Sequence, residues 1–429
     1  MLRADRIIII LYIFSLAGLL VSKTVMPFID EAATVFLIIL AIADSTINGR
    51  WKQYTGLWIL LGIMAFYSAY SLTIVHFNSA PYVLLDALLE SKPFVAFFTF
   101  FAIAPIFTHK EKRILQISAL AVGCISILVL MMGLQFTLLI FGHPFVAGSL
   151  AFIGAISYWY GSTDNDGNLS KHDRLVVLFL LCGGLLCTRS KYYGCFVISI
   201  FFLFFYRPGL LRHVNIKHMA MVLSLCIIVV AVAWNKITYY FITGNSDILD
   251  PNLASSMARA ALLVTTPLIL WDFLPFGSGL ASYASHPSAA NYSGLYPEYS
   301  LDKVWGLSPT MPDFITDLYF ASLAQVGIVG IILFIYFWIF AYRYLKSLLR
   351  SDTTKYKNLF SIGSIIICFV LIECVGGNTF VQPSGHVAMM LLGIICGQSK
   401  RLIIKQNTSS RSKEVAVLES PKETKRFKI

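Results

Sequence analysis

Residues 114–133 read ILQISALAVGCISILVLMMG, a run of twenty residues without a charged side chain. An α-helix of that length is long enough to cross the hydrocarbon layer of a membrane, which is about 30 Å thick. Backbone N–H and C=O groups find no water in that layer, and a helix satisfies them internally. The run therefore predicts a membrane-spanning helix.

The composition extends this prediction to the whole chain. Of the 429 residues, 57% are apolar and 13% are charged, whereas an ordinary globular domain has about 45–50% apolar and about 25% charged residues. The apolar residues are grouped in runs long enough to span. We predict an all-α, polytopic integral membrane protein with about 12 transmembrane helices, at residues 7–21, 32–48, 56–75, 93–107, 114–133, 138–160, 175–187, 192–206, 218–234, 318–342, 358–376 and 381–397.

The basic residues predict how these helices are oriented. If the N-terminus is cytoplasmic, the inside segments contain 26 of the 33 lysine and arginine residues, as the excess of positive charge on the cytoplasmic side requires. Both termini are then cytoplasmic. The seven outside cations are Lys23, Lys92, Arg189, Lys191, Lys236, Arg259 and Lys303.

Four regions follow from this layout. Residues 1–234 hold helices 1–9, residues 235–316 form one large outside loop, residues 317–397 hold helices 10–12, and residues 398–429 form a basic cytoplasmic tail. The loop has 82 residues, whereas most connections have about four to six, and loops of such length are usually functional. The tail is polar enough to be disordered and to lie near anionic lipid.

The net charge of +11 follows from this topology and does not indicate a nucleic-acid partner. The eight cysteines all fall within apolar runs or at their ends, which favours packing over a disulfide or a zinc site. We therefore predict no metal site.

Outside cations are scarce, and three of them are candidates for binding a phosphate. Arg189 and Lys191 lie in a short hairpin, TRSKYYG (188–194), at the outer lipid surface, and Arg259 precedes an apolar interfacial helix. Arginine binds phosphate oxygens bidentately, and lysine acts as a point charge. The alternative is that these side chains reach the headgroups of ordinary phospholipids.

Proton transfer needs a carboxylate or a histidine, and the outer side offers Asp317, Asp313 and His286. Asp317 is the first choice, although it also suits the N-terminus of the helix that follows it. Histidine has an unperturbed pKa near neutrality, which makes His286 a candidate base, although a loop histidine is more often inert. The rings of Tyr283, Tyr292 and Trp305 are suited to flat sugar faces, or to anchoring at the membrane interface.

Three segments resemble a known family. ARAALLVTTPLILWDFLPFGSGL (258–280) has an arginine, an apolar helix and a Pro-Phe-Gly-x-Gly turn, and DFITDLYFASLAQVGIVG (313–330) has Gly327 and Gly330 in a Gly-x-x-Gly position. With TRSKYYG, these segments resemble the O-antigen polymerase (Wzy-type) and O-antigen ligase superfamily of polytopic membrane glycosyltransferases. Two positions depart from its pattern: Lys191 replaces the usual arginine, and Thr316 replaces the histidine of the ligases.

The resemblance implies that the protein lies in the cytoplasmic (inner) membrane of a bacterium. At the periplasmic face of that membrane it would polymerise oligosaccharide repeats linked to undecaprenyl diphosphate, with a lipid-linked glycan as donor and another as acceptor. It implies no cofactor, and leaves room for a chain-length regulator and a flippase as partners. Arg189, Lys191 and Arg259 would bind the diphosphate, Asp317, Asp313 or His286 would take the proton, and Tyr283, Tyr292 and Trp305 would contact glycan. The alternatives are an O-antigen ligase, which transfers glycan to lipid A-core, and a lipid-linked oligosaccharide flippase.

Overall fold

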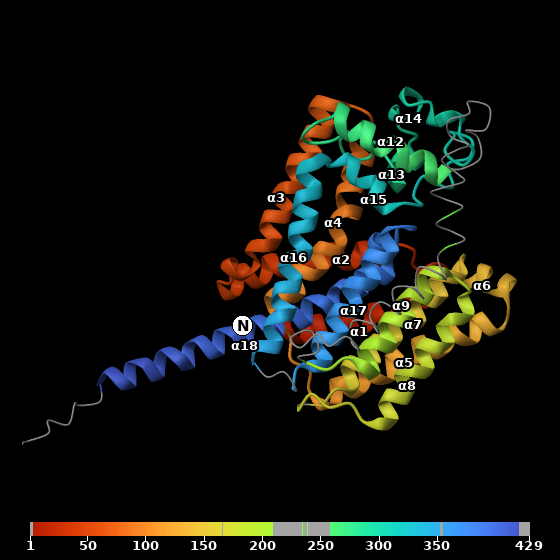
Figure 1. The fold of residues 1–429 in the computed structure, drawn as a ribbon. Coiled ribbons are helices and arrows are strands. Elements are labelled where there is room, and N and C mark those ends of the chain that lie inside the picture. Colours follow the sequence, from red (N-terminus) through yellow and green to blue (C-terminus); the bar gives the residue numbers. More distant parts are fainter. Residues whose placement is uncertain are drawn as a thin grey trace, which may run out of the picture.

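The computed structural model describes residues 3–164, 166–208, 258–351 and 355–419, together with residues 234 and 238. Within these ranges the regular structure is helical and there is no β-strand, which confirms the all-α prediction (Figure 1). The predicted span at 218–234 lies outside the described residues except for Trp234, as do the first part of the predicted loop with Lys236 and the end of the tail, residues 420–429.

The longer helices of the first half are α1 (Ala4–Gly18), α2 (Ile29–Asn48), α3 (Thr55–Tyr70), α4 (Ala80–Ile103), α5 (His109–Met131), α6 (Leu134–Phe141), α7 (Pro144–Ser162), α8 (Lys171–Gly184) and α9 (Ser190–Ile200). The described α-helices of the second half, long and short, are α12 (Ala258–Asp272), α13 (His286–Ala290), α14 (Leu295–Glu298), α15 (Tyr319–Ser322), α16 (Gly327–Ser351), α17 (Lys357–Cys374) and α18 (Pro383–Glu419). Short turns of 3₁₀- or π-helix are η1 (Trp51–Tyr54), η2 (Ser71–Val75), η3 (Leu185–Cys187), η4 (Phe201–Phe205), η6 (Leu301–Lys303), η7 (Leu323–Gln325) and η8 (Thr379–Val381).

Five described helical segments are long and apolar enough to cross a membrane: Trp51–Val75, His109–Met131, Gly327–Arg350, Lys357–Cys374 and Pro383–Gln406. A sixth is obtained if α6 and α7, which are bent by 74° relative to each other, form one broken span. The chain is therefore a membrane protein by the length and apolar character of these helices. Other predicted spans correspond to shorter apolar helices or, as in α4 with Asp86, Glu90 and Lys92, to a helix that carries several charges.

Local sequence explains where several helices begin. At α5, the Thr108 side chain accepts a hydrogen bond from the Glu111 N–H, and the Glu111 carboxylate accepts one from the Thr108 N–H. This reciprocal arrangement satisfies two backbone donors at the helix start. At α7, Pro144 occupies the first turn, and the His143 side chain accepts from the Phe145 N–H. Proline suits this position because it has no N–H to satisfy.

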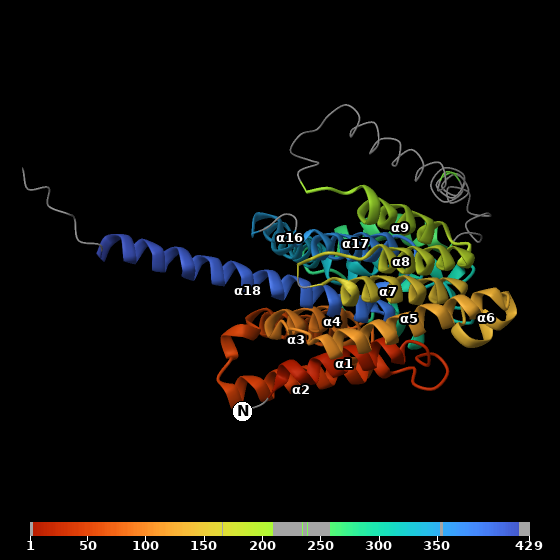
Figure 2. The same ribbon diagram turned by 90° about the horizontal axis from the view of Figure 1, so that it is seen from below.

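The helices pack in successive layers, which Figure 2 displays from α1 and α2 through α4, α5 and α7 to α17 and α9. Small residues allow close approach, as is usual within membranes. A Cβ atom added at Gly154 of α7 would lie 2.8 Å from the Ala119 carbonyl oxygen of α5, and one at Gly393 of α18 would lie 2.5 Å from the Phe97 carbonyl oxygen of α4. Larger side chains at these glycines would separate the layers.

Aromatic rings fill the space between α4 and α16. Phe337 lies edge-on against Phe94 and Phe97, with ring centroids 4.9 Å apart in both pairs. Edge-to-face contacts of this kind add to the stabilisation from buried area by about 0.5–1.5 kcal/mol per pair. They hold α16, and the segment before it, against α4.

Residues 258–326, from α12 to η7, form a separate layer that we call the cap, at the top of Figure 1. The cap has its own hydrophobic core, which includes Leu262, Tyr283, Tyr296, Leu307 and Ile315. A loop with such a core is an ordered structural element. The cap contains the predicted outside loop from residue 258 onward and also residues 317–326, so the helix predicted to start at residue 318 starts instead at Gly327.

The turn at Gly277 fixes the cap to the membrane helices. Gly277 has a positive φ of 82°, and a Cβ atom there would lie 2.3 Å from both the Ala324 carbonyl oxygen and the Gly327 nitrogen. Only glycine fits this close approach. From α3, the Tyr70 hydroxyl donates to the Gly277 carbonyl at 2.9 Å. From α4, the buried Asp86 accepts from the Ala281 N–H at 2.6 Å.

The start of the predicted tail differs from the expectation of disorder. Helix α18 continues without a break from Pro383 to Glu419, and Figure 2 shows it extending well beyond the rest of the bundle. The residues from Ser399 to Glu419 are therefore a helical extension, because the apolar residues before them have already started a helix that needs only propagation.

Candidate functional site

A cavity of about 200 Å³ lies where the cap meets α7, α9 and η8. Its charged and titratable lining residues are His143, Arg189, Lys191, Arg259 and Asp317. All three predicted phosphate-binding cations and the first-choice carboxylate therefore line one cavity. The remaining lining residues are Phe145, Val146, Ser190, Thr316, Gly376, Gly377, Asn378, Thr379 and Gln382.

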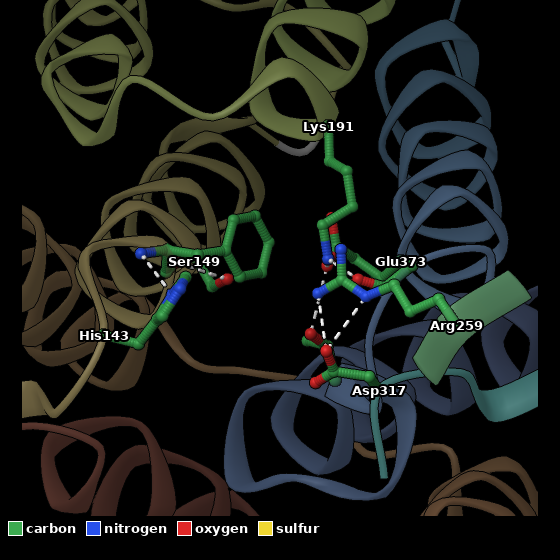
Figure 3. Close-up of polar contacts among 9 residues, drawn as sticks. His143, Ser149, Lys191, Arg259, Asp317 and Glu373 are labelled. Carbon is green, nitrogen blue, oxygen red and sulfur yellow. Dashed lines mark hydrogen bonds and ion pairs between the residues drawn. The ribbon is translucent and has the colours of Figure 1, made fainter. Parts of the chain in front are cut away.

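Arg259, in the first turn of α12, is bound to Asp317, which lies just before α15. Its Nε and Nη2 atoms donate to the same carboxylate oxygen, Asp317 Oδ2, at 2.9 and 2.6 Å (Figure 3). Both side chains are only partly exposed. Two charge-assisted bonds fix the plane of the guanidinium group, so the pair joins the two ends of the cap at the edge of the cavity. The other carboxylate oxygen, Oδ1, has no hydrogen-bond partner among the described residues.

Lys191, in the first turn of α9, reaches α17 (Figure 3). Its Nζ donates to Glu373 Oε2 at 3.0 Å and to the Gly376 carbonyl oxygen at 2.7 Å, and it lies 4.4 Å from the centre of the Phe145 ring. The Glu373 side chain has no exposed surface. A buried carboxylate needs a partner, so Lys191 compensates Glu373 as well as lining the cavity.

Arg189 is the cation that the described residues leave without a partner. Its side chain is partly exposed, and its buried Nε atom has no hydrogen-bond acceptor in the part of the chain that the structure describes. No carboxylate lies within ion-pair distance of it there. A guanidinium group that lines a cavity and has unused donors is suited to an anion.

His143 lies between α6 and α7, opposite Arg259 and Asp317 across the site (Figure 3). Its Nδ1 accepts from the Phe145 N–H at 3.1 Å, so in the neutral ring the proton is on Nε2. Burial, together with the positive charges of Arg189 and Lys191, lowers the pKa of His143 below its usual value of 6.5. His143 is therefore a neutral imidazole near pH 7 that can donate one hydrogen bond.

Sequence reasoning did not select His143, because it falls inside the predicted span 138–160. The signal was Gly142–His143–Pro144, since glycine and proline on either side of a capping residue mark a helix break. The structure has this break, with α6 ending at Phe141 and α7 starting at Pro144.

Two of the predicted proton acceptors lie elsewhere. His286, at the start of α13, and Asp313, ahead of α15, are both exposed, and neither lines the cavity. The structure thus brings Asp317 to the cations and leaves the other two candidates apart. The cap folds with residues 285–313 on its own core, away from α7 and α9.

The three predicted sugar-binding rings also lie outside the cavity. Tyr283 is fully buried, and its hydroxyl donates to the Leu262 carbonyl at 2.7 Å, so the expectation that it contacts glycan is not supported. The Tyr292 hydroxyl donates to the Leu307 carbonyl at 2.6 Å, and burial raises the pKa of Tyr292 to about 12. Trp305 is 53% exposed and packs against Phe314, so it alone presents a large free surface.

Among the described residues, the charges around the cavity sum to an excess of one positive charge. The positive groups are Arg189, Lys191 and Arg259, the negative groups in that part of the chain are Asp317 and Glu373, and His143 is neutral. A small, partly dry site of this kind attracts a negative group, because charges interact more strongly there than in water. Among the described residues, no group of three or more histidine, cysteine or acidic side chains could hold a metal ion.

No protein family model matches the sequence, and no curated protein matches it either.

Proposed function

We propose that the protein is a membrane glycosyltransferase of the O-antigen polymerase and ligase superfamily, and that it polymerises undecaprenyl-diphosphate-linked oligosaccharide repeats at the periplasmic face of the inner membrane. One observation carries the proposal: Arg189 and Lys191, at the start of α9, and Arg259, in the first turn of α12, line one small cavity where the described side chains leave an excess of positive charge. A lipid diphosphate at the membrane surface is the anion that such a cavity would meet.

In the reaction, the bond between the anomeric carbon of the donor glycan and the diphosphate oxygen breaks. The hydroxyl oxygen of a second lipid-linked repeat forms a new bond to that carbon, and undecaprenyl diphosphate leaves with the electron pair. Negative charge develops on the leaving group, and fixed donors stabilise it most in the transition state. Arg189, which has unused donors, binds the diphosphate first, with Lys191 and Arg259 beside it.

His143 and Asp317 have different roles in this proposal. The Nε2–H of His143 donates to a diphosphate oxygen and, because its Nδ1 is already used by Phe145, the neutral ring is not a base. The proton of the acceptor hydroxyl goes to Asp317, whose Oδ1 is available while Oδ2 is held by Arg259. Arg259 thereby orients the carboxylate as well as contributing charge.

The layout of the chain supports the proposed topology of about twelve spans, two cytoplasmic termini and a large periplasmic loop. Arg189 and Arg259, which the charge distribution assigns to the outside, share one cavity with Gly376, the last residue of the predicted span 358–376, although they are far apart in sequence. The two longer segments of the family resemblance also pack together, since Gly277 and Gly327 are in backbone contact. Both facts are what a common outer site requires.

The test uses purified protein in liposomes with a lipid-linked repeat as the only substrate. We expect products with two or more repeats and release of undecaprenyl diphosphate. Transport of the labelled repeat without chain growth would instead identify a flippase. In cells, deletion of the gene should leave core lipid capped by one repeat, whereas bare core with accumulated lipid-linked polymer would identify a ligase.

A further inference from the structure

A second charged cleft lies at the end of the molecule remote from the cap. Helix α4 contacts the cap near its first turns, through Asp86, and ends at Ile103, which lines this cleft. The 24 residues of α4 separate the two ends by about 36 Å, at about 1.5 Å per residue. The cleft has a volume of about 710 Å³ and is lined by Arg3, Asp5, Arg6, Arg50, Ile103, Ile106, Phe107, Thr108 and Arg401.

The four arginines come from three different parts of the chain. Arg3 and Arg6 are at the start of α1, Arg50 follows α2, and Arg401 is in α18. Four guanidinium groups repel one another, so their convergence is unfavourable without anions. The packing of the helices does not by itself explain why four arginines line the same cleft.

Carboxylates of the protein compensate only part of this charge. Arg6 binds Glu111 at 2.5 Å and lies 3.8 Å from Asp5, and Arg50 lies 3.7 Å from Asp44. Arg3 and Arg401 have no carboxylate within 4.0 Å among the described residues. Arg401 Nη2 donates to the Ile103 carbonyl oxygen at 2.8 Å, so the described residues leave the other donors of Arg401, and those of Arg3, for an external anion.

One wall of the cleft is apolar. Ile103 and Phe107 are buried, while Ile106 is 65% exposed. Ile106 lies in the link between α4 and α5, beside the arginines that line the same cleft. An exposed isoleucine next to converging arginines suits a ligand with a phosphate and an adjoining hydrocarbon part.

We infer that this cleft binds the phosphate-bearing headgroup of an anionic phospholipid. The arginines hold the phosphate oxygens, and Ile106 contacts the start of an acyl chain. Basic pockets between helices are a known way to bind anionic lipid at a membrane surface. The site is independent of the proposed reaction, and with the proposed topology it lies in the inner leaflet.

The experiment measures lipid retained by the detergent-purified full-length protein, by native mass spectrometry after exchange into equal amounts of phosphatidylglycerol and phosphatidylcholine. The wild type should retain phosphatidylglycerol in preference. The double variant Arg50→Gln/Arg401→Gln should lower that retention by about tenfold or more, the loss expected for charged hydrogen bonds. Asp44 still accepts from Asn48 and Tyr54 in this variant, so the buried carboxylate is not left alone.

Arg3→Gln disturbs the fold less, because Arg3 is exposed and has no carboxylate partner among the described residues. It should lower the retention of phosphatidylglycerol by a smaller factor than the double variant does. Lys110→Gln is the matched control, since Lys110 is an exposed cation near the same end that does not line the cleft, and it should leave retention unchanged.

Added inorganic diphosphate distinguishes a lipid headgroup from a soluble phosphate compound as the ligand. Displacement of the lipid by diphosphate at micromolar concentration would identify a soluble phosphate ligand instead. Equal retention of both lipids by the wild type, or equal losses in Lys110→Gln and the cleft variants, would overturn the inference.

Discussion

Arg259 donates two hydrogen bonds to a single oxygen of Asp317, although the two residues are 58 positions apart in the chain. The pair closes the cap at the point where it meets the cavity, because Arg259 begins the cap's first helix and Asp317 precedes its last. Arg259 therefore both supplies positive charge to the cavity and orients the Asp317 carboxylate. A change in Arg259 removes a cation from the cavity and also frees the carboxylate that the proposed reaction uses.

Replacement of Arg259 by alanine should reduce polymer formation by about a hundredfold or more, as loss of one transition-state donor does in other enzymes. Arg259→Lys keeps the charge but loses the fork that holds Asp317, so it should recover only a part of the activity. The measurement is the rate of chain growth in liposomes, at equal amounts of protein. Lys303→Ala is the control, because Lys303 is an exposed cation of the cap that does not line the cavity. Normal polymer from Arg259→Ala would remove this residue from the site.

His143 should act as a hydrogen-bond donor and not as a base. Asparagine at this position can still cap α7 through its side-chain oxygen but has no donor where Nε2 lies, so His143→Asn should keep the fold and lower the rate by about tenfold to a hundredfold. Because the pKa of His143 is lowered, the ring stays neutral above about pH 6.5. Protonation of the ring leaves the Nε2–H in place, so the ratio of the wild-type rate to the variant rate should not rise with pH between about pH 5 and pH 7. A ratio that rises with pH through this range would assign His143 as the base.

Sequence reasoning identified the class of fold and the cations of the site for the same physical reason. Charged groups are costly inside a membrane, so they are scarce in the chain, and the few on the predicted outer side are easily recognised. Arg189, Lys191 and Arg259 were selected in this way, and they line one cavity. The number of spans is harder to predict, because short helices and helices such as α4 mix apolar and charged residues.

The sequence alone does not predict which aromatic side chains of the cap are buried. Tyr283 and Trp305 are close in the chain and chemically alike, but the first is fully buried and the second is 53% exposed. Which ring is buried depends on how the cap packs on itself, and no local periodicity reports that. The break at His143 was hidden for a related reason, since apolar runs on both sides of it read as one span.

Lys191 has a structural role that can be separated from anion binding. Lys191→Met leaves the fully buried Glu373 carboxylate without its cation, which should cost about 3 kcal/mol or more and lower the melting temperature in detergent. The double variant Lys191→Met/Glu373→Gln removes both charges and should recover most of that stability. Chain growth should stay low in the double variant, because the cavity still lacks a cation. Recovery of stability and activity together would mean that Lys191 serves only to compensate Glu373.

The turn at Gly277 should be required for attachment of the cap. In Gly277→Ala, the added methyl group would meet the Ala324 carbonyl oxygen and the Gly327 nitrogen at 2.3 Å, on a backbone with φ of 82°. The turn must then move away from η7 and α16, which loosens the hydrogen bond from Tyr70. We expect faster proteolysis within residues 258–326 and less folded protein in the membrane. Gly62→Ala is the control, since a Cβ atom added at Gly62 would meet no atom of the other described residues within 4 Å. Equal protease resistance of both variants would show that the cap is held by its other contacts, such as Asp86 with Ala281.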